Sequence, residues 1–131
     1  MMNRTLPGQH IAPPAANYAH GVLSEASGRM LHTAGIVGVT PDGTVPLGID
    51  DQADVIWSSI FSLLVEADMT PQDIVSVTTY VVASRLGELG VVMATRDRYL
   101  AGHLAASTLV TVPALARPEW LMEIVVVAVS S

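Results

Sequence analysis

The sequence predicts one α+β domain in which two helices cover one face of a β-sheet. The predicted elements follow the order β-β-α-β-α-β-β, which suits an α+β layer. The length of 131 residues suits one hydrophobic core, so residues 1–131 are expected to form a single domain. The last strand, 121–129, is apolar on both faces, because its odd-numbered and even-numbered residues are both mostly hydrophobic. Two helices cannot cover both faces, which predicts that the second face packs against neighbouring subunits.

The N-terminal part of the chain is expected to hold an irregular lead-in and two strands. Residues 1–17 are rich in proline and glycine, which favours irregular structure. The segment 18–24 is a candidate short strand, and 29–39 is a second one. Gly35 and Gly38 lie inside the second strand, where glycine indicates a bulge or a close approach of the backbone to another group.

The clearest helix is predicted over 50–68. The turn at 40–43 precedes it, because proline presets φ there and the following glycine tolerates a positive φ. Asp50 or Asp51 is expected to cap the helix and to interact with the positive end of its dipole. Apolar residues then recur at helical spacing as far as Ala67.

The second half of the chain alternates strands with one more helix. The valines, threonines and tyrosine of 74–83 predict a strand. A helix is predicted over 86–100, with a first turn weakened by two glycines and an end at Ala101-Gly102. Strands are predicted over 108–113 and 121–129.

Composition excludes several classes of protein. Half of the residues are hydrophobic and 14% are charged, which predicts apolar surface hidden between copies of the chain. The net charge of −6 and the lack of a basic stripe disfavour a nucleic-acid partner. No apolar run approaches the ~20 residues that span a membrane. The first nine residues lack the apolar core of a signal peptide, and there are no cysteines, so a cytoplasmic location is expected.

One carboxylate, Glu123, lies inside the most apolar segment of the sequence. Burying an ionised carboxylate without partners is costly, so this one is hydrogen-bonded, neutralised by a proton, or at the wall of a polar pocket. A half-buried carboxylate suits general acid–base chemistry. The alternative is a structural ion pair with one of the arginines, at position 29, 96, 98 or 117.

The order and spacing of several short segments resemble the Rid (reactive intermediate deaminase) family, also called YjgF, over about 18–129. These segments are Tyr18-Ala-His-Gly21, Thr33-Ala-Gly35, Thr40-Pro-Asp-Gly43, Gln52, Asp73-Ile-Val75, Thr79-Tyr-Val81 and Met122-Glu-Ile124. The resemblance implies a chorismate-mutase-like fold and a homotrimer with a central barrel. It also implies a small-molecule cleft at each subunit interface, where enamines or imines are hydrolysed to ammonia and a 2-keto acid.

The chain departs from the family pattern where the resemblance places a substrate-clamping arginine. The family carries Pro-Ala-Arg-Ser at the start of the fourth strand, and the matching residues here are Leu104-Ala105-Ala106-Ser107. Ala106 therefore stands where a guanidinium would hold the substrate carboxylate bidentately. Met93, on the second helix, is another departure, because many family members carry a polar residue there.

The resemblance assigns roles to other residues of the cleft. Glu123 corresponds to the carboxylate that positions or activates the attacking water. Tyr18 corresponds to an aromatic residue near the cleft, and Gly35 to a backbone position that faces the ligand. Thr108, together with Ser107, is expected to line the pocket, because no nucleophile elbow surrounds these hydroxyls.

Two residues before the last strand have two interpretations each. Arg117 could reach the cleft and replace the missing clamp, although a solvated loop is favoured for its segment. Trp120 could stack on a ligand, although a core or interface position is favoured. The four histidines show no metal-ligand spacing, and the glycine patterns that bind phosphate groups are absent, so we expect no metal and no other cofactor.

The sequence thus favours a Rid-type hydrolase acting on C–N bonds of an enamine or imine, with a substrate range altered by Ala106. The alternatives are a non-catalytic trimer that binds a small metabolite at its interfaces, and a scaffold with a vestigial cleft.

Overall fold

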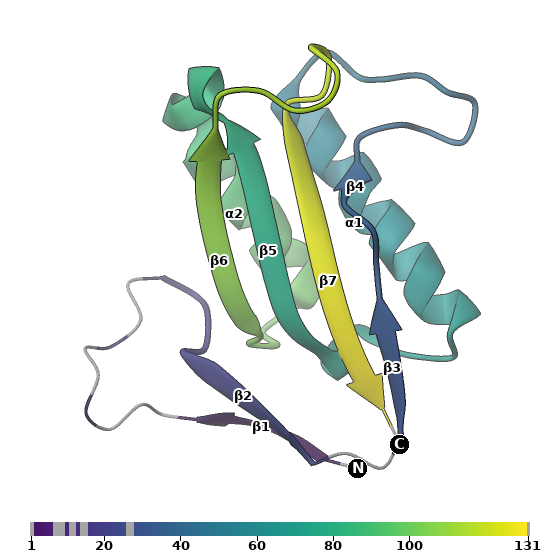
Figure 1. Cartoon of the computed structure of the whole chain (residues 1–131), viewed down its shortest axis with the longest axis vertical. Coiled ribbons are helices and arrows are strands. Elements are labelled where there is room, and N and C mark those ends of the chain that lie inside the picture. Colours follow the sequence, from purple (N-terminus) through teal and green to yellow (C-terminus); the bar gives the residue numbers. More distant parts are fainter. Residues whose placement is uncertain (1, 7–9, 11–12, 14–15, 26–27, 131) are drawn as a thin grey trace.

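In the computed structural model, which describes residues 2–6, 10, 13, 16–25 and 28–130, two helices cover one face of a mixed sheet (Figure 1). The strands are β1 (Met2–Leu6), β2 (Gly21–Glu25), β3 (Arg29–His32), β4 (Ile36–Val37), β5 (Ile74–Val82), β6 (Ala106–Val112) and β7 (Met122–Ser130). The α-helices are α1 (Ile49–Glu66) and α2 (Leu89–Leu100), and the 3₁₀ helices are η1 (Pro71–Asp73) and η2 (Ala83–Glu88). The α+β prediction is confirmed.

The main sheet has the order β3-β7-β5-β6, and β4 also pairs with β7. Strands β5 and β6 run parallel, because α2 carries the chain back between them, and the other pairs are antiparallel. In Figure 1, β5 and β6 end at the top of the sheet, where β7 begins. We call this the upper end, and the end with the start of β6 the lower end.

The hydrophobic core lies between the sheet and the helices. The even-numbered residues of β7, from Met122 to Ala128, are buried against this core, whereas Glu123, Val125 and Val127 are half-buried on the other face. The alternation predicted for 121–129 is therefore confirmed. Trp57 of α1, which is fully buried, stacks on Tyr99 of α2 with 6.2 Å between ring centroids, and so joins the two helices.

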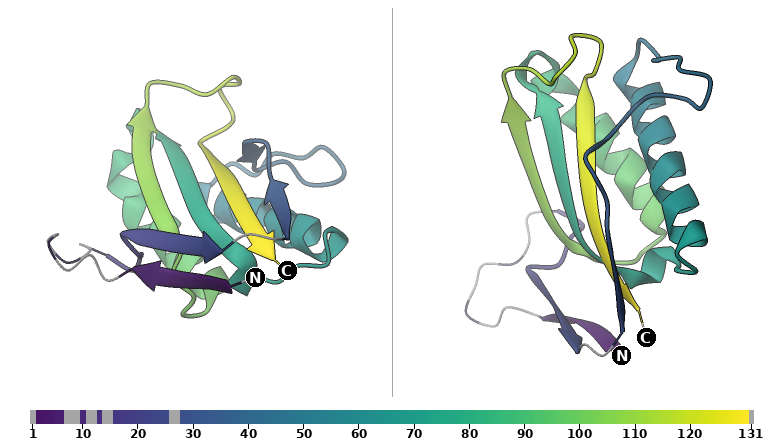
Figure 2. Two further views of the ribbon diagram at one scale, coloured as in Figure 1. Left: turned by 60° about the horizontal axis from the view of Figure 1, so that its bottom comes forward. Right: turned by 45° about the vertical axis from the view of Figure 1, so that its right-hand side comes forward.

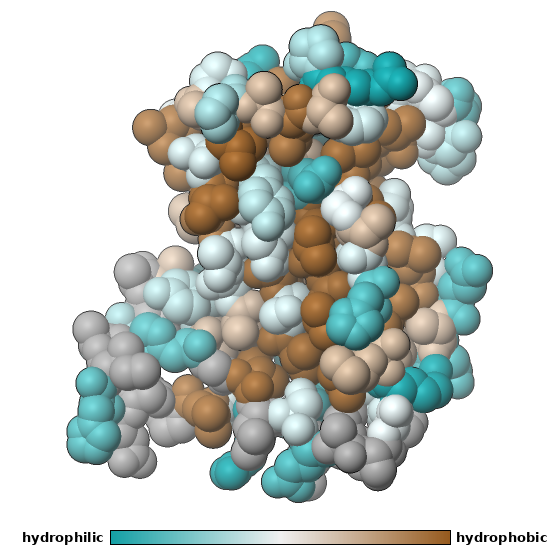
Figure 3. Space-filling view, viewed as in Figure 1, coloured by the Kyte–Doolittle hydropathy of each residue, from teal (hydrophilic) through white to brown (hydrophobic). Residues whose placement is uncertain are grey.

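The second face of the main sheet, which we call the open face, carries no helix (Figure 2). Cross-strand pairing orders its side chains in rows. The upper row is Val37, Glu123, Tyr80 and Val110, and the lower row is His32, Val127, Ser76 and Ala106. Figure 3 views this face, where apolar side chains are interspersed with polar ones.

The expectation of an irregular lead-in over 1–17 is wrong for its first residues. Strand β1 pairs antiparallel with β2 as a separate two-stranded sheet across the lower end of the molecule (Figure 2). Asn3 Nδ2 donates to Val129 O over 3.0 Å, which ties β1 to the end of β7. The rest of the lead-in lies largely outside the described residues. A strand of five residues has little periodicity of its own, and its partner provides the hydrogen bonds that order it.

The strand predicted over 29–39 is broken between β3 and β4. Thr33 causes the break, because its hydroxyl oxygen accepts the hydrogen bond of Val126 N over 2.9 Å, while Thr33 N donates to Val126 O. A side-chain oxygen thus replaces a backbone carbonyl in the ladder. The predicted close approach to another group is also found at both glycines.

Three other boundaries differ from the sequence prediction. Helix α1 begins at Ile49 after an extended Gly48, so neither aspartate caps it, although both lie in its first turn. The start predicted for the second helix is instead the 3₁₀ segment η2, which agrees with a weak first turn. Strand β6 begins at Ala106, two residues earlier than predicted, since parallel pairing with β5 extends it.

A run of charges on a helix, such as Arg96-Asp97-Arg98 on α2, is typical of an exposed face, but this expectation is wrong for Arg96. Only 7% of Arg96 is exposed, because α2 packs this residue against β6, whereas the Arg98 side chain is largely in solvent. In the part of the chain that the structure describes, no helix is long and apolar enough to cross a membrane.

Candidate functional site

Glu123 lies on the open face near the upper end of the sheet. It is the second residue of β7, and cross-strand pairing places it between Val37 of β4 and Tyr80 of β5. Its side chain is half-buried, because the helices cover only the opposite face. The carboxylate is thus held by a rigid central strand and remains within reach of solvent.

The Glu123 carboxylate lies directly over the backbone of Gly35. A Cβ atom added to Gly35 would lie 2.4 Å from Cδ of Glu123, and 2.8 Å or less from both carboxylate oxygens. No side chain fits there while the carboxylate keeps this position. Glycine at 35 therefore allows a close approach of backbone and carboxylate.

Among the described residues, no hydrogen-bond donor or cation pairs with the Glu123 carboxylate. The four ion pairs that the described arginines make go to Asp54, Glu88, Asp97 and Glu119. A structural ion pair for Glu123, the alternative left open by the sequence, is therefore not found within these residues. An unpaired carboxylate within reach of solvent is available to a ligand or to water.

Ala106 lies at the opposite, lower end of the open face, where it begins β6. Ala19 forms a parallel bridge with it, and Ala19 N donates to Ala105 O over 3.1 Å. This bridge places Tyr18 beside the start of β6, with the Tyr18 ring edge-on to His20 at 5.8 Å between centroids. Thr108, two residues further along β6, is exposed on the same face.

Within one chain, Glu123 and Ala106 are far apart. Ala106 shares its row with Val127, which lies four residues beyond Glu123 on β7, and β5 separates the two strands. These offsets correspond to about 16 Å along the sheet. One copy of the chain therefore presents two separate groups, one around Glu123 and Gly35, and one around Ala106, Thr108 and Tyr18.

Ser107 and Met93 lie on the helix side of the sheet. Ser107 Oγ accepts a hydrogen bond from Nη1 of Arg96 over 3.3 Å, so its hydroxyl points toward α2. Met93 is a half-buried residue of α2 itself. Neither side chain belongs to the open face that carries Glu123.

Arg117 and Trp120 lie in the segment between β6 and β7, at the upper end. The Arg117 guanidinium carbon lies 5.7 Å from the centre of the Trp120 ring, and Arg117 Nη1 is 4.0 Å from Glu119 Oε1. This cation–π contact keeps the arginine within its own exposed loop. Arg117 therefore lies at the other end of the sheet from Ala106.

A model of the family described as endoribonuclease L-PSP matches residues 9–130. YyfB from Yersinia pestis, a protein of unknown function in the conserved Rid family, is 30% identical, with a TM-score of 0.89 over 99% of this chain and 100% of that chain. The chain belongs to the Rid/YjgF family. The YjgF gene product of E. coli is 24% identical, with a TM-score of 0.72 over 98% of this chain and 99% of that one.

E. coli TdcF, solved with bound serine, has the same fold at 21% identity, with a TM-score of 0.72 over 98% of this chain and 99% of that chain. No curated protein matches significantly. The described residues hold no group of three or more side chains that could ligate a metal ion.

A hollow of about 700 Å³ in this Rid chain lies away from both groups of site residues. It follows the outer side of α1, between Thr40-Pro41 and Tyr99, and three serines contribute to its lining. Its one charged side chain, Asp54, already pairs with Arg98. The hollow contains none of the residues that the sequence indicated as catalytic or substrate-binding.

Two buried polar residues behind the candidate site were not recognised from the sequence as contacts that support it. Gln52 lies in the buried stripe of α1, and Arg96 lies in that of α2. A polar residue at an apolar position of a helical repeat was the available signal in both cases. Tyr80, which shares the row of Glu123, could have been found only from the strand register.

Proposed function

We propose that the protein is a small-molecule hydrolase of the Rid enamine/imine deaminase type, with an altered substrate range. The observation that carries the proposal is the Glu123 carboxylate, which lies over Gly35 on the open face without a partner among the described residues. A preorganised carboxylate with access to water is what imine hydrolysis requires.

In the proposed reaction, Glu123 accepts a proton from water while the water oxygen bonds to the imine carbon. The C=N π electrons move to nitrogen, which takes up a proton, and a carbinolamine results. A further proton reaches nitrogen, the C–N bond breaks, and ammonia leaves as the remaining hydroxyl loses its proton to form the carbonyl. Overall, imine and water give ketone and ammonia. No metal or redox cofactor takes part.

We infer that the complete site forms between two copies of the chain in a homotrimer. About 16 Å separates Glu123 from Ala106 within one chain, which is too far for both to contact one small metabolite. The open face also carries valines that are half-buried or exposed, among them Val125 and Val110. A second copy would cover these valines and bring its own Ala106 group toward Glu123.

Because Ala106 cannot bind a carboxylate, the proposed substrates are ligands that place no carboxylate next to Ala106. A methyl group cannot donate hydrogen bonds, whereas each charge-assisted bond is worth roughly 1.5–3 kcal/mol, so loss of a bidentate clamp weakens carboxylate binding about 100-fold or more. Arg96 does not substitute, because Asp97 and Ser107 hold it on the other face of the sheet. A bulkier or less charged imine is therefore favoured.

The direct test measures ammonia release from freshly generated imines and enamines that differ in side chain and in the presence of a carboxylate. Wild type should turn over a member without a carboxylate, and Glu123→Gln should lower kcat by about 100-fold or more. Ala106→Arg should shift preference toward carboxylate-bearing members. Turnover of 2-iminopropionate by wild type at the rate of arginine-bearing relatives would contradict the assigned role of Ala106.

The alternative of a binding protein is distinguished in the same panel. Saturable binding without ammonia release, unchanged in Glu123→Gln, would mean that the cleft binds a metabolite without reacting. Ammonia release only after Ala106→Arg would mean that the family geometry persists while the family substrate is lost. The absence of both binding and turnover would favour a scaffold.

Complementation tests whether two chains share the site. Glu123→Gln removes one half of the site, and Ala106→Trp blocks the other half in a separate chain. Unfolding and refolding an equal mixture should restore about one quarter of the wild-type activity, since that share of random interfaces pairs two intact halves. A site within one chain would restore none. Light scattering of each variant gives the oligomeric state.

The family description also names an endoribonuclease, and the charges of this chain do not support that activity here. The net charge is −6, and five of the six arginines contact carboxylates or backbone carbonyls. Adding a structured RNA to the panel gives a control. Cleavage that Glu123→Gln abolishes would overturn the proposed substrate class.

A further inference from the structure

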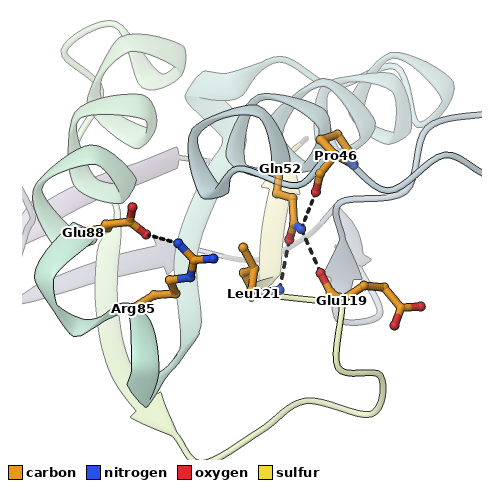
Figure 4. Close-up of polar contacts among 6 residues, drawn as sticks. All are labelled: Pro46, Gln52, Arg85, Glu88, Glu119 and Leu121. Carbon is orange, nitrogen blue, oxygen red and sulfur yellow. Dashed lines mark hydrogen bonds and ion pairs between the residues drawn. The ribbon is translucent and has the colours of Figure 1, made fainter.

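Gln52, in the first turn of α1, is fully buried, and both polar atoms of its amide group make hydrogen bonds. Nε2 donates to Pro46 O over 2.7 Å and to Glu119 O over 2.9 Å (Figure 4). Oε1 accepts from Leu121 N over 3.0 Å. All three partners are backbone groups in segments without regular structure. A single side chain thus provides the hydrogen bonds that these backbone groups would otherwise obtain from a helix or a β-sheet.

The partners of Gln52 surround the strand start that carries Glu123. Leu121 lies two residues before Glu123, and Glu119 two residues before Leu121. The amide therefore fixes the peptide from which β7 begins. A shift of this peptide would move the second residue of the strand, and with it the carboxylate.

The aliphatic part of Gln52 packs against the other strand next to the carboxylate. A Cβ atom on Gly38 would lie 2.8 Å from Cβ of Gln52 and 3.0 Å from its Cα. Gly38 directly follows Val37, which pairs with Glu123. Both backbone segments beside the carboxylate, the start of β7 and the end of β4, are thus held by Gln52.

A primary amide suits this position better than any other side chain. It offers two donors and one acceptor without charge, and two carbonyls and one N–H surround it here. A glutamate of the same shape would place its negative charge beside two carbonyl oxygens and would be repelled by them. An asparagine would be one methylene too short. A methionine would keep the length and lose all three hydrogen bonds.

We propose that Gln52 is a positioning residue that holds the start of β7 against β4 and so keeps the Glu123 carboxylate over Gly35. The proposal rests on the function proposed for Glu123, and its geometric part stands independently of which substrate reacts. The predicted consequence is a loss of carboxylate position without loss of the fold.

The experiment follows the backbone amide of Gly35 by NMR across a pH titration, which needs no substrate. In wild type this amide should report protonation of the carboxylate above it, and Glu123→Gln should abolish the signal, which assigns it. In Gln52→Met at least half of the pH-dependent shift of Gly35 should disappear. Thr95→Val is the matched control, because Thr95 is also buried and its hydroxyl bonds only to Val91 O within α2.

Once an imine that wild type hydrolyses is known, Gln52→Met should lower kcat by about 10- to 100-fold with little change in KM. Misplacing a catalytic group reduces stabilisation of the transition state more than it reduces substrate binding. Should Gln52→Met fail to fold, Gly38→Ala displaces the same side chain from the other direction and should give the same loss at Gly35.

An unchanged Gly35 titration in a folded Gln52→Met protein would overturn the proposal, as would an equal change in Thr95→Val. A changed titration without turnover of any imine by wild type would uphold the positioning role and remove the deaminase proposal instead.

Discussion

Each end of the sheet contains a buried polar side chain that reaches from a helix to a strand of the site, but the two ends use different chemistry. At the upper end, the neutral amide of Gln52 binds three backbone groups around the start of β7. At the lower end, the charged guanidinium of Arg96 binds side chains around the start of β6.

The lower-end contacts form a chain of side chains. Arg96 Nη1 donates to Ser107 Oγ, and Arg96 Nε donates to Asp97 Oδ1 over 3.1 Å. Asp97 Oδ2 in turn accepts from Asn17 Nδ2 over 2.9 Å, which joins α2 to the segment that carries Tyr18. Arg96 Nη2 lies 3.0 Å from Asp97 Oδ1, but it is buried and not aligned for a hydrogen bond.

The difference concerns how each end responds to change. The backbone groups that bind Gln52 are present whatever the side chains of those residues are, and a neutral amide does not respond to salt or to pH. The hydrogen bonds at the upper end therefore persist under changes of sequence and solution conditions. A buried cation depends on its one carboxylate, and removing that carboxylate leaves an uncompensated charge. The contacts at the upper end therefore hold the backbone beside Glu123 in a fixed position. The lower end is stable only while the Arg96 cation keeps its carboxylate partner.

The largest effect should come from breaking the lower-end ion pair. Asp97→Ala leaves the Arg96 guanidinium buried without an anion, so the free energy of unfolding should fall by about 3 kcal/mol. Asp54→Ala is the control, because it breaks the exposed pair with Arg98 and should cost at most about 1 kcal/mol. Urea denaturation measures both. Similar losses for the two variants would show that burial of Arg96 does not matter.

A smaller loss should follow from crowding the upper end. In Gly38→Ala the added methyl group meets Cβ and the backbone Cα of Gln52, so the free energy of unfolding should fall by about 1–3 kcal/mol. Gly90→Ala, in the first turn of α2, meets no atom within 4 Å and should stabilise the protein by about 0.5 kcal/mol. Thermal unfolding of the two variants side by side checks this, and equal midpoints would refute it.

Gly35→Ala should separate stability from function. The atoms that its methyl group meets are the end of the Glu123 side chain, which can rotate away, so unfolding should change by no more than about 0.5 kcal/mol. The carboxylate then leaves its position, and kcat for imine hydrolysis should fall by about 100-fold. Ammonia release and a denaturation curve on the same sample measure the two effects. Retained kcat would mean that the carboxylate acts from another position.

The smallest effect concerns Asp42, in the turn that leads from β4 toward α1. Hydrogen bonds, first from the Thr40 hydroxyl and then from Thr44, hold the pKa of this carboxyl below its usual value of 3.8. The ionised form is thus favoured in the folded state. Its contribution to stability is present above the usual pKa and is lost as pH falls through the lowered one.

Asp42→Asn should therefore be slightly less stable than wild type at neutral pH, and the difference should vanish in acid. Urea denaturation of both proteins at a series of pH values measures this. A difference that grows as pH falls would have the wrong sign and would contradict the assignment.

Part of the fold was predictable because the information lies in neighbouring residues. The helical repeat of 50–68, the β-branched run of 74–83 and the turn at 40–43 each depend on local conformational preferences, and each is found within a few residues of its predicted bounds. The two-sided apolar strand 121–129 likewise follows from alternation alone. For the site, the sequence was sufficient to indicate Glu123 as an unusual carboxylate and Ala106 as a departure.

The sequence by itself determined both helices, the three long strands, the family and the identity of the candidate residues, because each depends on local pattern or on motif order. The tertiary structure decided which of these residues meet. Gln52 binds a peptide 69 residues away, and Arg96 is buried only because β6 returns beneath α2. The separation of Glu123 from Ala106 follows from the strand register, which no single segment encodes, because hydrogen bonds between distant segments set it.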